Sequence, residues 1–233
     1  MTATLLATLL TATAAAVAAR TPARQEPPPP PAPLPPAAGQ ARQLPSAQGR
    51  LVGSTYTNDF FGFTISLNPT WAAIDYATRR QINEAGRAAL QEGIPQRTKE
   101  MMDATTARVD NLFSVSKYDV NKPGPEFNAL LMCLAERIPT AVVKTEKDYV
   151  TIALRTINQT AAKAELTAPL RTEMLGGVAF TVADMKLTVG PRMLAQRYYV
   201  RLSKGYALAL VYSYVDEEDL QAVKEMVKTI RFK

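Results

Sequence analysis

The spacing of hydrophobic positions changes along the chain, and each change predicts a different element. Apolar and polar residues alternate over 63–67, which is typical of a half-buried strand, and a short strand over 56–58 precedes it. From about 75 to 91 the apolar positions recur every three or four residues, as on one side of a helix. Gly93 ends that helix, and Pro95 opens a second helix over about 95–105.

Further along, the pattern predicts more strands than helices. Strand-like runs cover 111–118, 127–137, 164–172, 178–189, 193–202, 206–214 and 229–232. Helical spacing returns only over 146–160 and 216–228, and the second of these places acidic residues in its first turn, where they complement the helix dipole. Glycine-containing turns separate the last long strands, as in an antiparallel meander. We therefore expect an α+β fold built on an antiparallel β-sheet.

The front of the chain has a different composition. Residues 1–19 carry no charged side chain and end in small residues, as in a secretory signal peptide. Ten of the 17 prolines follow between Pro22 and Pro45, a density that favours a stiff polyproline II spacer over a packed core. We predict a signal peptide over 1–19, a proline-rich linker over 20–48 and one domain over 49–233. The protein is then exported to a periplasmic or extracellular location, and an uncleaved leader would tether it to the membrane.

Composition excludes several kinds of chemistry. The chain has no histidine, which removes His-dependent nucleophilic catalysis and His-ligated zinc. Its one cysteine, Cys133, lies in an apolar segment, so we expect a buried, inert thiol. The net charge is +6, but the basic residues are dispersed and Arg79-Arg80 is the one adjacent pair in the domain, a pattern that does not favour nucleic-acid binding. We predict no cofactor and no metal site.

Two segments resemble a known family. The run over 56–71 reads YTNDFFGFTISLNPTW, and the run over 196–214 reads QRYYVRLSKGYALALVYSY before the last helix and strand. Both are similar to the corresponding parts of PsbP-like domains, whose best-known members are extrinsic subunits of photosystem II. The resemblance implies an antiparallel sheet with helices on both faces, an αβα sandwich, which is a fold shared with a Ran-binding nuclear import factor. It brings no catalytic residues, and the helical segment after Trp71 is longer than the family pattern.

Two functional hypotheses follow. The first is a non-enzymatic module of the cell envelope that binds a protein partner or assists assembly, with Tyr199, Arg201, Tyr212 and Tyr214 as the predicted contact residues. The second is a small-ligand-binding or weakly catalytic domain that uses a cleft between the helical segment 75–105 and the sheet. The acidic pairs Asp103 or Asp110 with Glu126, and Asp184 with Glu173, are the remaining carboxylate candidates.

Overall fold

A computed structural model describes residues 48–233 except residues 92, 107, 123 and 126. Its larger sheet is antiparallel, and within the described residues it has eight strands. Seven of them follow in the spatial order β4 (Ala72–Ala73), β5 (Val109–Ser116), β6 (Leu130–Arg137), β11 (Tyr206–Tyr214), β10 (Arg192–Ser203), β9 (Val178–Val189) and β7 (Ala162–Leu166). The eighth strand, β8 (Arg171–Leu175), pairs with the other half of β9. The predicted antiparallel α+β fold is confirmed.

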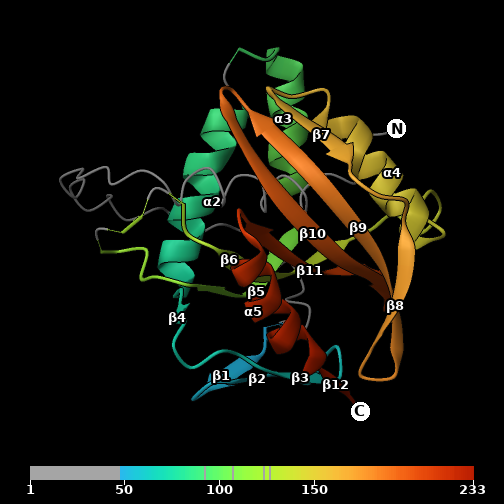
Figure 1. The fold of residues 1–233 in the computed structure, drawn as a ribbon. Helices are drawn as coiled ribbons and strands as arrows, with labels where there is room; N and C mark the ends of the chain where they lie inside the picture. Colours follow the sequence, from blue (N-terminus) through green and yellow to red (C-terminus); the bar gives the residue numbers. More distant parts are fainter. Residues whose placement is uncertain (1–47, 92, 107, 123, 126) are drawn as a thin grey trace, which may run out of the picture.

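A smaller antiparallel sheet joins the two ends of the described chain. It contains β1 (Arg50–Val52), β2 (Thr55–Asn58), β3 (Phe63–Ser66) and β12 (Arg231–Phe232), in that order. Figure 1 shows it at the bottom of the view, next to the C-terminus. The pairing of β3 with β12 matches Phe63 with Phe232, whose rings lie 5.8 Å apart.

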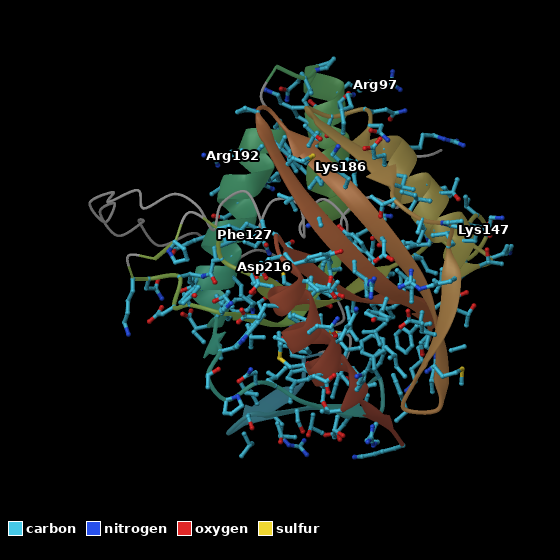
Figure 2. All side chains as sticks on the ribbon, viewed as in Figure 1. Arg97, Phe127, Lys147, Lys186, Arg192 and Asp216 are labelled. Atoms are coloured by element: carbon cyan, nitrogen blue, oxygen red, sulfur yellow. The ribbon has the colours of Figure 1, made fainter. Side chains whose placement is uncertain are left out.

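The four helices of the described residues begin close to where the sequence predicts them. They are α2 (Tyr76–Leu90), α3 (Gln96–Thr106), α4 (Glu146–Ile157) and α5 (Glu217–Lys228). Three of them begin after a residue whose side chain accepts a hydrogen bond from a backbone N–H of the first turn. These residues are Asp75 for α2, Thr145 for α4 and Asp216, which Figure 2 labels, for α5. Thr145 and Asp148 form a reciprocal capping box. No described helix is long and apolar enough to cross a membrane.

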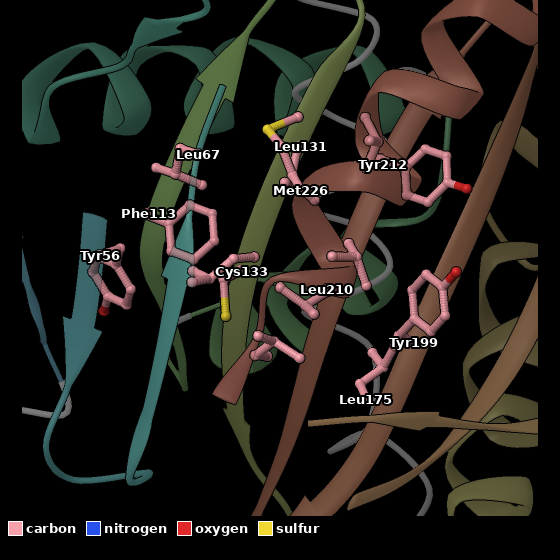
Figure 3. Packing of buried hydrophobic residues seen from close by; sticks show 14 of the residues in the cluster. Tyr56, Leu67, Phe113, Leu131, Cys133, Leu175, Tyr199, Leu210, Tyr212 and Met226 are labelled. Carbon is pink, nitrogen blue, oxygen red and sulfur yellow. The ribbon is translucent and has the colours of Figure 1, made fainter. Parts of the chain in front are cut away.

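The central strand β6 supplies two separate cores. Leu130, Met132 and Leu134 belong to one hydrophobic cluster, together with residues of α2 and α4. Leu131, Cys133 and Ala135 belong to the other, together with residues of α5 and the small sheet, part of which Figure 3 shows. This alternation follows from the two-residue period of a strand that is covered on both sides. The finer arrangement as an αβα sandwich stays a prediction.

Cys133 is buried, as predicted. Its exposed fraction is zero, and burial raises the pKa of its thiol well above the ordinary value. Because the thiolate is the reactive form, a thiol in this environment behaves as a small hydrophobic side chain.

Some predictions fail or fall outside the described residues. The single strand predicted over 164–172 is wrong, because the chain forms β7 and β8 with an irregular segment between them. Pro169 lies in that segment and has no N–H to give to a ladder. The two-residue strand β4 and the edge strand β1 were not predicted. The predicted leader over 1–19 and all but the last residue of the predicted linker over 20–48 lie outside the described residues.

Candidate functional site: a cleft beside helix α2

Helix α2 presents a polar row at helical spacing. Six polar or aromatic residues share one side of the helix, because they follow one another at intervals of three, one, three, one and three positions. They are Tyr76, Arg79, Arg80, Asn83, Glu84 and Arg87. The packing side adjoins this row: Ile82 packs against the first core cluster, and Leu90, seven residues after Asn83, lies inside it. Arg79 and Asn83 fall at the boundary between the two sides, which explains why both are only half exposed.

The polar row forms one wall of a cleft. The cleft has a volume of about 700 Å³, and its other lining residues are Gln48, Asp103 of α3, and Val109, Asp110 and Asn111 at the start of β5. This volume lies within the usual range for small-molecule sites. Figure 1 shows α2 and α3 together in the upper part of the view, above β5. The second hypothesis from the sequence predicts a cleft between the helical segment 75–105 and the sheet, which is where this cleft lies. Its lining is polar, whereas most ligand pockets are mainly apolar.

Most of the charges in the cleft are paired with one another. Arg80 contacts the carboxylate of Glu84 at 3.3 Å, within one turn of α2. Arg87 contacts Asp103 at 3.3 Å and so links α2 to α3. These side chains are half-exposed or exposed, and ion pairs of this kind contribute little to stability. Their effect is to leave Arg79 as the cleft arginine with no ion pair among the described residues.

Arg79 is held by backbone and aromatic contacts. Its Nη1 donates a hydrogen bond to the carbonyl oxygen of Ile74 at 3.1 Å, and its guanidinium lies 5.9 Å from the ring centre of Tyr76. Burial lowers the pKa of Arg79, although the nearby carboxylate of Asp75 acts to raise it. Arg79 is still protonated at neutral pH, because the ordinary pKa of arginine is very high. Its Nε is buried and has no hydrogen-bond partner in the described part of the chain. The cleft therefore contains a fixed cation with a free donor.

Two acceptor groups lie on the same cleft. The Oδ1 of Asn83, one turn beyond Arg79, is buried without a donor. Asp110 lines the cleft and makes no ion pair within the part of the chain that the structure describes, and desolvation raises the pKa of its carboxyl against the lowering effect of Arg137. Behind Arg79 and Asn83 a smaller space of about 10 Å³ reaches Asn111 and Ser114, whose hydroxyl donates to the Asn111 side chain at 3.1 Å.

The arrangement is suited to binding. Within the described residues, no group of three or more acidic, cysteine or histidine side chains is placed to hold a metal ion. Asp103 and Asp110 both line the cleft, while Glu126 lies outside the described residues. Asp184 and Glu173, the other carboxylate pair considered from sequence, are brought together by Arg171, which contacts them at 2.6 and 2.9 Å.

The four residues predicted to contact a partner lie elsewhere, on the side of the large sheet that α5 partly covers. Tyr199 and Tyr212 are buried, with ring centres 6.5 Å apart, and Tyr214 is half-buried, 5.4 Å from Tyr212. Figure 3 shows the rings of Tyr199 and Tyr212 projecting from neighbouring strands. Arg201 is half-buried, and its guanidinium lies 5.2 Å from the ring centre of Phe232. Their role in partner binding stays a prediction.

The sequence contains a signal for the cleft that the predictions did not use. The apolar spacing of α2 predicts its packing side, and Arg79, Glu84 and Arg87 are not among those apolar positions. Their shared spacing with Asn83 marks a continuous polar row. The half-burial of Arg79 and Asn83 depends on how α2 lies against the sheet, which the spacing alone does not give.

The buried tyrosines yield a first prediction. Burial raises the pKa of Tyr212, and its hydroxyl has no hydrogen-bond partner within residues 48–233 as described, so the residue bears an uncompensated desolvation cost. We expect Tyr212→Phe to raise the free energy of unfolding by about 1 kcal/mol. Urea denaturation followed by the emission of Trp71, the single tryptophan, measures it.

Tyr198 provides the matched control for this prediction. Its hydroxyl donates to the Oε1 of Gln196 at 2.7 Å, and Gln196 in turn donates to Ser213 at 2.8 Å. Removing the Tyr198 hydroxyl leaves part of this buried network unsatisfied, so Tyr198→Phe should lower the free energy of unfolding by about 1 kcal/mol. Equal destabilisation by the two variants would contradict the assignment of Tyr212 as unpartnered.

The fold and the site define an antiparallel α+β domain with a polar, arginine-containing cleft beside its longest described helix. No family model matches the chain, and no curated protein matches it. Among solved structures, it is similar to the cyanobacterial PsbP (CyanoP) of Synechocystis sp. PCC 6803, with 12% identity and a TM-score of 0.46 over 84% of this chain and 99% of that one.

A second similar structure is LpqN of Mycobacterium tuberculosis, a protein involved in cell envelope biogenesis. It shares 11% identity and a TM-score of 0.37 over 78% of this chain and 85% of LpqN. The structures similar to this chain thus include a PsbP, as the sequence resemblance predicts. At these TM-scores the likenesses carry no part of the functional argument.

Proposed function

We propose that the domain is a non-enzymatic binding module and that the cleft beside α2 holds a small polar ligand. The observation that carries this proposal concerns two residues that line one cleft of about 700 Å³. Arg79 has no ion pair, and its Nε and the Oδ1 of Asn83 are buried without a hydrogen-bond partner among the described residues. Buried polar groups are nearly always hydrogen-bonded in folded proteins, and unpaired ones indicate a missing partner.

The cleft is tested by mapping where small molecules bind. A library of small polar organic molecules is titrated into the ¹⁵N-labelled protein, and the shifts of backbone amide resonances are followed. We expect at least one compound to shift the amides of α2 together with those of Val109, Asp110 and Asn111. Val109→Trp narrows the cleft and should remove these shifts.

Val215 is the matched control position. It is an exposed valine between β11 and α5, outside the cleft lining, so Val215→Trp should leave the shifts unchanged. The proposal fails if no compound shifts the cleft amides. It also fails if the shifts persist in the Val109→Trp variant, because the ligand would then be bound somewhere else.

Binding of a protein partner is a second candidate, and the surface around Tyr214 favours it. Tyr214 is half-exposed at the end of β11 and follows Tyr212 on the same side of the sheet, next to the arginines of the Asp184 network. Aromatic and arginine side chains are enriched at protein interfaces. In-cell crosslinking tests this candidate: recovery of one envelope complex, lost in Tyr214→Ser, would support it.

We further propose that the domain acts outside the cytoplasmic membrane, in the periplasm or the extracellular space. The support is the uncharged, small-residue pattern of residues 1–19 and the proline-rich stretch that follows it. Cell fractionation that recovers the intact chain, leader included, free in the cytosol would contradict this location.

A further inference from the structure

The polar groups of the cleft are specific enough to indicate the chemistry of the ligand. Resting on the proposed function above, we infer that the ligand is a zwitterionic α-amino acid. Its carboxylate binds the free edge of Arg79, and its ammonium group donates to the Oδ1 of Asn83 in the field of Asp110. Three observations support this assignment.

The first observation is the orientation of Arg79. A guanidinium has two edges that can bind a carboxylate with two parallel hydrogen bonds. In Arg79 the Nη1 is already engaged by the carbonyl of Ile74, whereas Nε has no partner. Nε–H and Nη2–H point along the same edge, so the edge that remains free is the side-on carboxylate edge. Arg197 uses this same edge to bind Asp184 elsewhere in the protein, through its Nε and its Nη2.

The second observation is the polarity of Asn83. Its Oδ1 is a buried acceptor without a donor, and it lies one helical turn from Arg79 on the same row of α2. A ligand that satisfies both residues presents an acceptor to Arg79 and a donor close to that acceptor. The carboxylate and ammonium groups of an α-amino acid are attached to one carbon atom and meet this requirement.

The third observation is the charge balance of the cleft. The lining contains three arginines and three carboxylates, and Arg80 and Arg87 are paired with Glu84 and Asp103. Among the residues that the structure describes, this leaves one cation of the lining without an ion pair, Arg79, and one such anion, Asp110. A phosphate would add two negative charges to a lining whose charges are already balanced, close to the carboxylate of Asp110. A zwitterion leaves the balance unchanged.

The test uses three probes that differ in one charged group each. L-Phenylalanine carries both groups, 3-phenylpropionate lacks the ammonium group, and phenethylamine lacks the carboxylate. The shared phenyl group suits the apolar surface that Tyr76 and Val109 offer in the cleft. Isothermal titration calorimetry gives the affinities, and amide shifts locate the probe. We expect L-phenylalanine to bind in the cleft about tenfold or more tightly than either analogue.

Two substitutions assign each charged group to its residue. Arg79→Gln should weaken L-phenylalanine and 3-phenylpropionate by about tenfold or more and leave phenethylamine unaffected. Asn83→Leu should weaken L-phenylalanine and leave 3-phenylpropionate unaffected. Arg155→Gln is the control, because it removes the same charge from an exposed position in the last turn of α4. If Arg79→Gln does not fold, Arg79→Lys keeps the charge but loses the side-on edge, and it should still weaken L-phenylalanine.

The outcomes separate this inference from the proposed function. Equal affinities for L-phenylalanine and 3-phenylpropionate would overturn the amino-acid assignment. If other library compounds bind in the cleft but none of the three probes does, the amino-acid assignment is also wrong. The proposed function would still stand in that case. If neither the probes nor the library shift the cleft amides, both proposals fail, and Arg79 and Asn83 are satisfied by water alone.

Discussion

Replacing Asp184 with alanine is expected to lower the free energy of unfolding by about 3 kcal/mol. The Asp184 carboxylate lies between two arginines. It accepts hydrogen bonds from the Nε and Nη2 of Arg197 and, at 2.6 Å, from the Nη1 of Arg171. The side chains of Asp184 and Arg197 are each only 12% exposed. Removing the carboxylate leaves Arg197 buried without its partner, and an uncompensated buried charge is among the costliest single changes in a protein.

A double variant separates the loss of a pair from the loss of packing. Asp184→Leu combined with Arg197→Leu removes both charges and keeps apolar volume, so it should recover more than half of the stability that Asp184→Ala loses. The ion pair of Glu165 on β7 with Lys186 on β9 also involves β9 but is exposed, and its two atoms are 3.7 Å apart. Glu165→Ala should therefore cost less than about 1 kcal/mol. Similar losses for Asp184→Ala and Glu165→Ala would contradict this account.

The effect of Asp184 depends on pH. Burial by itself would raise the pKa of its carboxyl, but the hydrogen bonds and charges of Arg197 and Arg171 outweigh burial and lower the pKa. A lowered pKa in the folded state means that the carboxylate stabilises the protein above its unfolded pKa of about 4. That contribution is lost as the pH falls through the folded pKa. The stability difference between the wild type and Asp184→Ala should therefore shrink below about pH 4.

The second large effect is expected at the turn between β8 and β9. Gly176 and Gly177 both have positive φ angles, +56° and +82°. A Cβ atom on Gly176 would lie 2.7 Å from the carbonyl oxygen of Ile230, whereas one on Gly177 would have nothing within 4 Å. Backbone cannot move away as a flexible side chain can. We expect Gly177→Ala to cost about 1 kcal/mol for the left-handed conformation, and Gly176→Ala to cost about 3 kcal/mol because a steric clash is added.

Gly177→Ala is the control for Gly176→Ala, because the substitution, the turn and the change in backbone freedom are the same in both variants. Thermal and urea denaturation followed by Trp71 emission provide the two free energies. Equal losses would show that the φ angles alone determine the cost and that the approach of Gly176 to Ile230 is not a tight contact.

Periodicity predicts most elements of this fold because burial repeats with the element. The alternation of Phe63 and Ile65 with polar residues marks β3, and the three-to-four spacing marks α2 and α4. It does not predict β4, since two alanines are too few to show a period. The division of β7 from β8 was missed although Pro169 indicates it.

The candidate site was predicted in place but not in chemistry. Segment 75–105 could be recognised as two helices beside a cleft, because its apolar spacing and the glycine and proline that mark the helix ends can be seen in the local sequence. The lack of an ion pair at Arg79 could not be predicted from the sequence. It depends on which carbonyl and which carboxylates come within reach of Arg79 after α2 packs on the sheet. Likewise, Tyr199 and Tyr212 were predicted as partner contacts, but the sequence alone does not tell that α5 and neighbouring residues bury them.

The small sheet has a consequence for the order in which the chain folds. β3 has β2 as its neighbour within a few residues of sequence, but its other neighbour, β12, consists of Arg231 and Phe232. Thr229 also closes this edge, by accepting from the backbone N–H of Ser66 across 163 positions. Contacts so distant in sequence form slowly, because a long loop must close first. During synthesis β3 therefore keeps an open edge until Arg231 and Phe232 have been made, although its hairpin with β2 can form much earlier.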